Sequence, residues 1–455
     1  MRMAGVLLVV ALIGAALLAA AGFVYRRPQR GLLVLAAATP LHGLLAIAPL
    51  PGAASAWKEG LVVFTALCAW LRRGGRIDRT HVPLYVPWWP AALALMAFGT
   101  VSAVVTFGII GVVAVKVTFF YVAIVVILWW APFDARDRDV LVTVLMVMTM
   151  FTSVVGIAQL IAGPGALVAL GYEYGTQVRT AGGMLRTFST FNQPFPFGLY
   201  VMLGLLVAGA VALAEPRRPR NMVFLALSPI MVIAMASSVV RASMLGLGVG
   251  LIWLALRRFR QLGIGLVAAA VVAVVAVPLL PARITGAFFS SRSLGERGAG
   301  WSDIISSIVV HPFGLGLGAS GAAADRMSTA SGVKFSGLST NYQPDNYYVK
   351  MLLELGPIGL WLFLVLIVTT LVWTTRLAGS LTGRDGALAL GVSASIVAAV
   401  FASMVATYFE IFPIDVYFWL LLGVIGCAAA QHESRSGRSP CDQAAVEFKP
   451  ISASF

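Results

Sequence analysis

One arginine stands between two apolar runs of the chain, among small polar residues. Arg241 lies in the string Ser-Ser-Val-Val-Arg-Ala-Ser, and the flanking segments 222–240 and 244–256 are apolar apart from small polar side chains. A guanidinium beside hydrocarbon is costly, and its planar fork of donors fits the oxygens of a phosphate. Arg241 is therefore either a phosphate clamp or an arginine whose long side chain only reaches back to water.

Two other arginines stand in polar loops. Arg186 lies in a polar cluster that runs from Arg179 to Asn192, and Arg297 lies four residues before Trp301. A solvated surface arginine is one interpretation of Arg297, and a functional charge near a boundary with hydrocarbon is the other. Trp301 offers a ring face that would stack on Arg297 or on a sugar.

Two residues are candidates for a general base. Asp345 directly precedes an apolar segment that begins at Tyr347. Its carboxylate would cap the start of a helix, take a proton from a hydroxyl group, or do both. His311 is the second candidate, because imidazole exchanges protons near neutral pH. The string His-Pro-Phe-Gly around it is also typical of a turn that only shapes a loop.

The amino-acid composition indicates that these residues lie in a membrane protein. Of 455 residues 60% are hydrophobic and 11% are charged, with a mean hydropathy of +0.92. Soluble domains carry about 25% charged residues, so most of this chain must face lipid. The net charge of +14 is explained by arginines in cytoplasmic loops near anionic lipid, without a nucleic-acid partner. The three cysteines lie far apart, without a CxxC string or a Cys/His cluster, so we expect neither a disulfide framework nor a zinc site.

Apolar segments predict an all-α, polytopic membrane helix bundle. A spanning helix needs about 20 apolar residues, and on this criterion we expect about 12 or 13 transmembrane helices. The predicted segments are 4–25, 31–50, 58–71, 89–107, 111–130, 140–162, 195–213, 222–238, 242–256, 262–281, 347–373, 387–408 and 413–430. Lys116 falls inside one of them and is expected to face the bundle interior or to reach the interface. Lys58 and Glu59 are expected to form a local pair.

Arginine clusters predict the orientation of the bundle. They follow the first, third and later segments at intervals of an even number of helices, so all fall on one side, which is the cytoplasm. The polar loop 282–346, with a Ser/Ala/Gly-rich stretch at 319–340, then lies outside. The predicted division is an N-terminal helical region 1–281, the large extracytoplasmic loop 282–346, a C-terminal helical region 347–430, and a disordered cytoplasmic tail 431–455.

The polar clusters, in this order, resemble the O-antigen ligase and O-antigen (exopolysaccharide) polymerase superfamily over roughly 150–425. The motifs that carry the resemblance are Ser-Ser-Val-Val-Arg241-Ala-Ser, Arg297-x3-Trp301, His311-Pro-Phe-Gly-Leu-Gly-Leu-Gly318 and Asp345-Asn-Tyr-Tyr-Val-Lys-Met-Leu-Leu-Glu354-Leu-Gly-Pro-Ile-Gly359. In one respect the chain departs from the ligases, which carry His-Asn where this chain has Asp345-Asn346.

The resemblance implies a metal-independent, inverting glycosyltransferase of the multi-spanning C-type class. Such enzymes move a glycan from a polyprenyl diphosphate carrier to a hydroxyl of a glycan or lipid-linked acceptor, outside the cytoplasmic membrane. By motif, Arg241 and Arg297 would bind the donor diphosphate, with Arg186 as a third cation. Asp345 would take the place of the family's histidine base, which favours the polymerase branch over a strict lipid A-core ligase. Trp301 and Tyr347 would stack on sugar rings.

No Walker motif, GxGxxG string or external DxD pair is present, so we expect no cofactor and no metal. The rival function is a flippase or transporter for lipid-linked oligosaccharides that breaks no bond. Such proteins show inverted repeats and charges near the bilayer midplane. This sequence has no internal symmetry, and its charges lie at one face.

Overall fold

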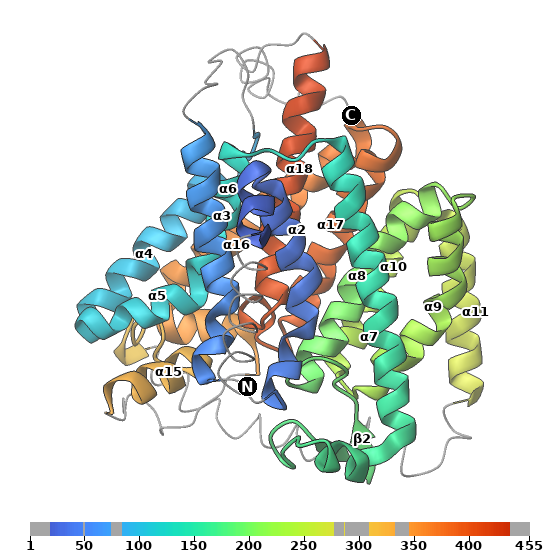
Figure 1. Ribbon diagram of the computed structural model, residues 1–455, viewed down its shortest axis with the longest axis horizontal. Helices are drawn as coiled ribbons and strands as arrows, with labels where there is room; N and C mark the ends of the chain where they lie inside the picture. The colour runs from blue at the N-terminus through green and yellow to red at the C-terminus, as the bar shows by residue number, and fades with distance from the viewer. Residues whose placement is uncertain are drawn as a thin grey trace, which may run out of the picture.

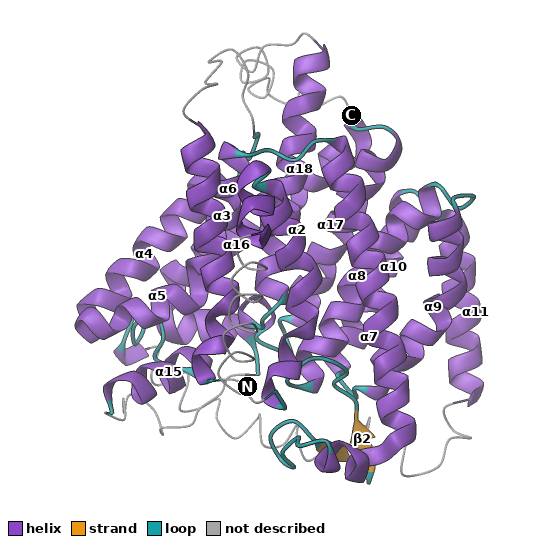
Figure 2. Cartoon of the chain, viewed as in Figure 1, coloured by secondary structure: helices purple, strands orange, loops and turns teal. Residues whose placement is uncertain are grey.

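The computed structural model describes residues 19–48, 51–73, 84–276, 286, 309–332 and 345–436. These residues are helical apart from turns, short loops and one two-stranded hairpin (Figure 2). The helices are α2 Gln29–Ala38, α3 Trp57–Arg72, α4 Trp89–Phe107, α5 Gly111–Phe119, α6 Ala123–Trp130, α7 Ala135–Ala169, α8 Pro194–Ala214, α9 Pro219–Ser237, α10 Arg241–Arg257, α11 Arg260–Ala276, α15 Gly321–Ser331, α16 Tyr347–Ser380, α17 Gly383–Ala402 and α18 Ile414–Ser436. The hairpin pairs β1 Arg179–Ala181 with β2 Met184–Arg186.

Seven helical stretches of the described chain are long and apolar enough to cross a membrane. They confirm the prediction of a polytopic all-α membrane protein. The total of about 12 or 13 spans stays a prediction. Helices α10 and α11 have only 17 residues each, and the first predicted segment lies largely outside the described residues.

The longest apolar stretch, Trp89–Trp130, is interrupted where the sequence has a glycine. Gly108 has φ +61° and ψ −144°, which ends α4 and lets the chain turn back into α5. A side chain at Gly111 would lie 2.3 Å from the carbonyl oxygen of Ala103, so α4 and α5 pack closely behind the turn (Figure 1). The structure therefore agrees with the two separate segments predicted for this region.

Helices α8, α17 and α18 form the centre of the bundle. Most of the apolar stretch of each is buried inside the protein (89%, 83% and 89%). Small residues allow the close approach of their neighbours. A side chain at Gly204 would collide with Thr149 of α7, and one at Gly391 would lie 2.8 Å from the backbone of Val207.

The directions of these helices determine which ends meet. Two glycines of α10 show the relative directions of the helices: Gly246 lies against Met202 and Ala398, and Gly250 lies against Leu206 and Ala394. From the first set of contacts to the second, the residue numbers rise on α10 and on α8, whereas they fall on α17. Helices α8 and α10 are therefore parallel to each other and antiparallel to α17. The starts of α8 and α10 and the end of α17 share one end of the bundle, together with the β1–β2 hairpin, and we call it the hairpin end (Figure 1).

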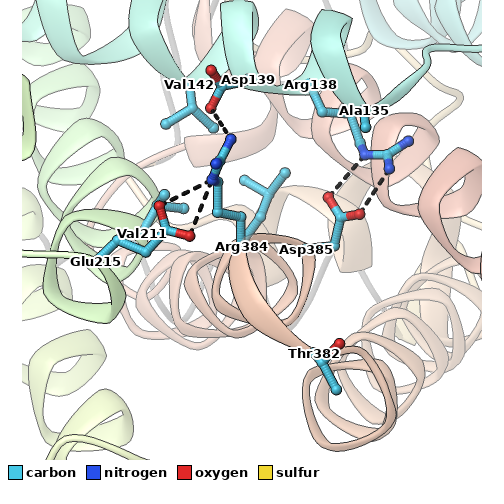
Figure 3. A pocket seen from close by; sticks show the side chains of 10 residues that line it. Ala135, Arg138, Asp139, Val142, Val211, Glu215, Thr382, Arg384 and Asp385 are labelled. Atoms are coloured by element: carbon cyan, nitrogen blue, oxygen red, sulfur yellow. Dashed lines mark hydrogen bonds and ion pairs between the residues drawn. The ribbon is translucent and has the colours of Figure 1, made fainter. Parts of the chain in front are cut away.

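Ion pairs join α7, α8 and α17 at the opposite end. Arg138 Nη2 lies 2.7 Å from Asp385 Oδ2, and Arg384 Nη1 lies 2.9 Å from Asp139 Oδ1. Glu215 accepts from Arg384 Nε at 3.0 Å. These side chains line a cavity of about 290 Å³ (Figure 3). We call this region the ion-pair end.

Two local predictions have different outcomes. Lys58 and Glu59 do pair, at 3.7 Å, and Lys116 reaches the same Glu59 at 3.0 Å while staying half exposed. The Ser/Ala/Gly-rich stretch was expected to be loop, but most of its first half forms α15. Alanines favour that helix, and Gly332, with φ +67°, ends it in the left-handed conformation.

Candidate functional site

Arg241 is the first residue of α10, directly after a sharp turn from α9. Val239, between the two helices, has φ +53°. A β-branched residue in that conformation is strained, and such strain gathers at functional sites. The cap residue, Val240, provides no side-chain hydrogen bond. The positive end of the α10 dipole therefore carries a guanidinium, which favours an anion at this point.

The hairpin brings two more arginines to the same place. In the β1–β2 register Arg179 lies opposite Arg186, and Arg186 Nε donates to the carbonyl oxygen of Ser238 at 3.2 Å. Burial lowers the pKa of Arg186, and the nearby charges of Arg179 and Arg241 lower it further. Like charges opposite each other on a hairpin are destabilising. A bound anion would relieve that repulsion.

Arg179 was predicted as the start of a polar cluster but was not named as a binding residue, although the sequence held a signal for its position. Gly182 and Gly183 have φ +58° and +78°, as a two-residue hairpin turn requires. A Gly-Gly pair between the short stretches Val178-Arg-Thr-Ala and Met184-Leu-Arg-Thr-Phe predicts such a turn, and the register then places Arg179 across from Arg186. The search for membrane segments overlooked these short strands.

The segment after the hairpin is fixed by buried hydrogen bonds. Thr187 Oγ1 lies 2.6 Å from Ser237 Oγ, and the backbone N–H of Thr187 donates to the carbonyl oxygen of Ser237. Gln159 of α7 accepts from the N–H of Ser189 and donates to its carbonyl oxygen, both at 2.7 Å. The end of α9, where the turn to Arg241 begins, is thus tied to the strand that carries Arg186.

Asp345 lies at the same end, but it is not the helix cap. Asn346 caps α16, because its side chain accepts from the N–H groups of Tyr348 and Val349. The N–H of Tyr347 donates to the carbonyl oxygen of Ser403, just past the end of α17. Asp345 is exposed. Because α17 ends where α10 begins, the structure brings Asp345 to the end of the bundle that holds Arg186 and Arg241.

His311 is separated from Asp345 along α16. It is exposed, and its carbonyl oxygen accepts from the N–H of Gly314. The turn docks where the N–H groups of Leu315 and Gly316 bind the carbonyls of Leu353 and Glu354. That point lies nine residues, or about 13 Å, along the helix from Asp345. The two candidate bases therefore occupy different levels of one helix.

The predicted sugar-stacking residues have mixed outcomes. Tyr347 is 4% exposed, and its ring packs against Phe363 and Phe409 at centroid distances of 5.0 and 5.4 Å. The prediction for Tyr347 is wrong in this geometry, because no ring face is open to a sugar. Arg297 and Trp301 lie outside the described residues. Within the described part of the chain no three His, Cys, Asp or Glu side chains gather to hold a metal ion.

One family model matches part of this chain. Residues 222–364 match the model of the O-Antigen ligase family. A comparison with curated proteins gave no match. The matched range includes Arg241, His311 and Asp345, and it ends inside α16. The resemblance seen in the sequence is confirmed for this region of the chain, and it indicates a membrane transferase of the ligase or polymerase type.

Proposed function

We propose that this protein moves a glycan from a polyprenyl diphosphate carrier to an acceptor hydroxyl at the hairpin end of the bundle. The observation that carries the proposal is the approach of Arg179 and Arg241 to Arg186, beside the starts of α8 and α10. Three cations and two helix N-termini suit a leaving group that carries two phosphates. The match of residues 222–364 to the O-Antigen ligase family supports this assignment.

The proposed reaction is a single displacement. The acceptor oxygen attacks the anomeric carbon of the donor glycan, the bond from that carbon to the diphosphate oxygen breaks, and its electron pair leaves on the diphosphate. Fixed guanidinium groups stabilise that charge, so no metal is needed. Asp345 takes the hydroxyl proton, with His311 as the second candidate. Attack opposite the leaving group inverts the anomeric centre.

The acceptor in this proposal is another carrier-linked glycan, which makes the protein a surface-polysaccharide polymerase. An aspartate stands at position 345 where the ligases for lipid A-core carry histidine, and that difference favours the polymerase branch. Arg297 would add a further cation for the diphosphate, and Trp301 would stack on a sugar.

The proposed location is the cytoplasmic membrane, with the site on the outer face. Short loops with several arginines stay in the cytoplasm. The string Arg217-Arg218-Pro-Arg220 lies at the junction of α8 and α9, at the ion-pair end. The hairpin end is then outside, where carrier-linked glycans are polymerised.

The test is a transfer assay in nanodiscs with a polyprenyl-diphosphate oligosaccharide, EDTA and no nucleotide sugar. Wild type is expected to release polyprenyl diphosphate and to extend the acceptor. Arg241→Ala should lower kcat about 10²- to 10³-fold, because it removes a donor aimed at developing charge. Asp345→Ala should lower kcat about 10²- to 10⁴-fold. Arg217→Ala, an exposed arginine at the ion-pair end, should retain full activity.

The rival function has a distinct outcome in the same membranes. Translocation of the lipid-linked glycan with the glycan–diphosphate bond intact would replace the transferase with a flippase. Transfer that survives Asp345→Ala would keep the enzyme and move the base to His311.

A further inference from the structure

A fully buried carboxylate, Glu354, organises the glycine-rich turn 311–320, which begins at His311. It lies on α16 and is 0% exposed. Its Oε2 accepts from the N–H of Gly318 at 3.1 Å. Its Oε1 accepts from the N–H of Ser320 at 3.0 Å and from the Ser320 hydroxyl at 2.7 Å. Nothing in the proposed reaction uses this carboxylate.

The backbone of α16 also forms hydrogen bonds with this turn. Pro357 has no N–H, and Gly356 leaves the helical conformation with φ +64°, so the helix bonds to the carbonyls of Leu353 and Glu354 are interrupted. The N–H groups of Leu315 and Gly316 donate to these two carbonyls, each at 2.9 Å. The carbonyl groups that the kink leaves without helix partners and the N–H groups of the turn therefore satisfy one another.

The charge of Glu354 is matched from its own helix. Lys350, one turn earlier and also fully buried, forms an ion pair with Glu354. Lys350 Nζ also donates to the carbonyl oxygen of Ser320 at 3.1 Å and lies 3.4 Å from Glu410 Oε2, in the turn between α17 and α18. A buried charge requires such partners. One cluster thus joins the glycine-rich turn, α16 and the α17–α18 turn.

We infer that Glu354 is a positioning residue that holds the turn carrying His311 and the helix start carrying Asp345 in one fixed arrangement. The inference rests on the proposed function, because the arrangement matters for transfer. The turn meets α16 through contacts with Leu353, Glu354 and Lys350 and through the close approach at Gly356. A misplacement of about 1 Å costs about 10²-fold in rate.

The first measurement is hydrogen exchange, which requires no substrate. Glu354→Gln keeps the side-chain volume but leaves only one acceptor oxygen. The amide NH₂ group would then face an N–H group of Gly318 or Ser320, which is also a donor. The amides of Gly316, Gly318 and Ser320 are expected to exchange about tenfold faster, with no change in α8. Unchanged protection of the turn would overturn the inference, whatever the protein's function.

The second measurement separates positioning from stability. In the transfer assay, Glu354→Gln is expected to lower kcat about 10²-fold with the donor KM within about threefold of wild type. Ser320→Ala, which removes the hydroxyl that donates to Oε1, is the milder variant and should lower kcat about tenfold. Ser331→Ala, at the far end of α15, is the matched control and should be unaffected.

The outcomes differ from those that test the proposed function. Faster exchange together with wild-type kcat in both Glu354→Gln and Ser320→Ala would reduce Glu354 to a structural role and overturn the inference. No transfer by wild type would remove the proposed function, while the exchange result would still decide whether Glu354 holds the turn.

Discussion

At the scale of single residues, the two ends of the bundle use arginine in opposite ways. At the ion-pair end Arg138 and Arg384 face carboxylates. At the hairpin end Arg186 instead lies opposite Arg179 and over the ring of Phe195, and it donates to the carbonyl oxygen of Ser238. Guanidinium groups that are held near one another raise the free energy of the empty protein, and an anionic ligand recovers it on binding. This contrast in the partners of Arg186, Arg138 and Arg384 supports the proposal that the hairpin end binds an anion.

Glu410 allows a prediction about pH. It lies in the turn between α17 and α18, and burial, opposed by Lys350 and reinforced by Glu354, raises its pKa to about 7. Arg326 and Tyr347 are its other charged or titratable neighbours. Because the folded protein holds this proton more tightly than the unfolded chain, the contribution of Glu410 to stability is present below about pH 4.5 and is lost as pH rises through about 7.

The measurement is thermal unfolding in detergent between pH 5 and 8. The difference in Tm between wild type and Glu410→Gln is expected to fall as pH rises, with the variant at least as stable as wild type at pH 8. Glu173→Gln, which changes an exposed glutamate beyond the end of α7, serves as the control. A Tm difference that is constant over this range would contradict the assignment.

At the scale of elements, the glycine-rich turn depends on backbone that only glycine supplies. Gly314 has φ +81°, and a side chain there would lie 2.3 Å from the carbonyl oxygen of Glu354. Gly332 has φ +67° with open space around it. Gly332→Ala should cost about 1 kcal/mol for the left-handed conformation, whereas Gly314→Ala should cost about 1–3 kcal/mol more because of the collision.

Denaturation midpoints of both variants would check this difference. Equal losses would mean that the turn moves away from α16 freely, and they would also weaken the positioning role given to Glu354.

The sequence predicted the helices better than the connections between them. Segments 89–107 and 111–130 begin and end where α4 and the α5–α6 stretch do, because hydropathy over about 20 residues is a strong signal. The hairpin and α15 were missed, since their signals are a glycine pair and a few alanines. Asn346, not Asp345, caps α16, because either residue type suits that position and only the backbone decides.

The proposed site residues were predicted by type, but their neighbours were not. Arg186, Arg241 and Asp345 lie at one end of the bundle, whereas Tyr347 is buried. Lys350 and Glu354 were part of a longer motif and were not predicted to form a pair. A spacing of four residues on a helix predicts a contact. It does not show that a turn from another segment, 314–320, completes the cluster.

At the scale of the whole molecule, the ion-pair end is expected to stabilise the bundle. Arg138 is 4% exposed, and it donates to Asp385, Gln431 and the carbonyl oxygen of Phe133. Arg138→Met should lower the free energy of unfolding by about 2–3 kcal/mol. This loss is smaller than the loss expected on breaking a fully buried ion pair, because Asp385 is partly exposed. Thermal unfolding would measure it.

The double variant Arg138→Met/Asp385→Asn should recover some of that loss. Arg217→Met, which changes an exposed arginine of the same end, should stay within about 0.5 kcal/mol of wild type. Equal destabilisation by Arg138→Met and Arg217→Met would argue against a specific ion-pair network.

The burial of α8 has a consequence for the order in which the protein is assembled. Alone, α8 is as apolar as a helix that faces lipid, yet 89% of its apolar stretch ends up against protein. The backbone of Val207 is covered by Gly391 of α17, which is synthesised well over a hundred residues later. Until α17 arrives, this side of α8 must rest in lipid. The close packing of α8 against α17 is therefore completed only when a helix synthesised late displaces that lipid.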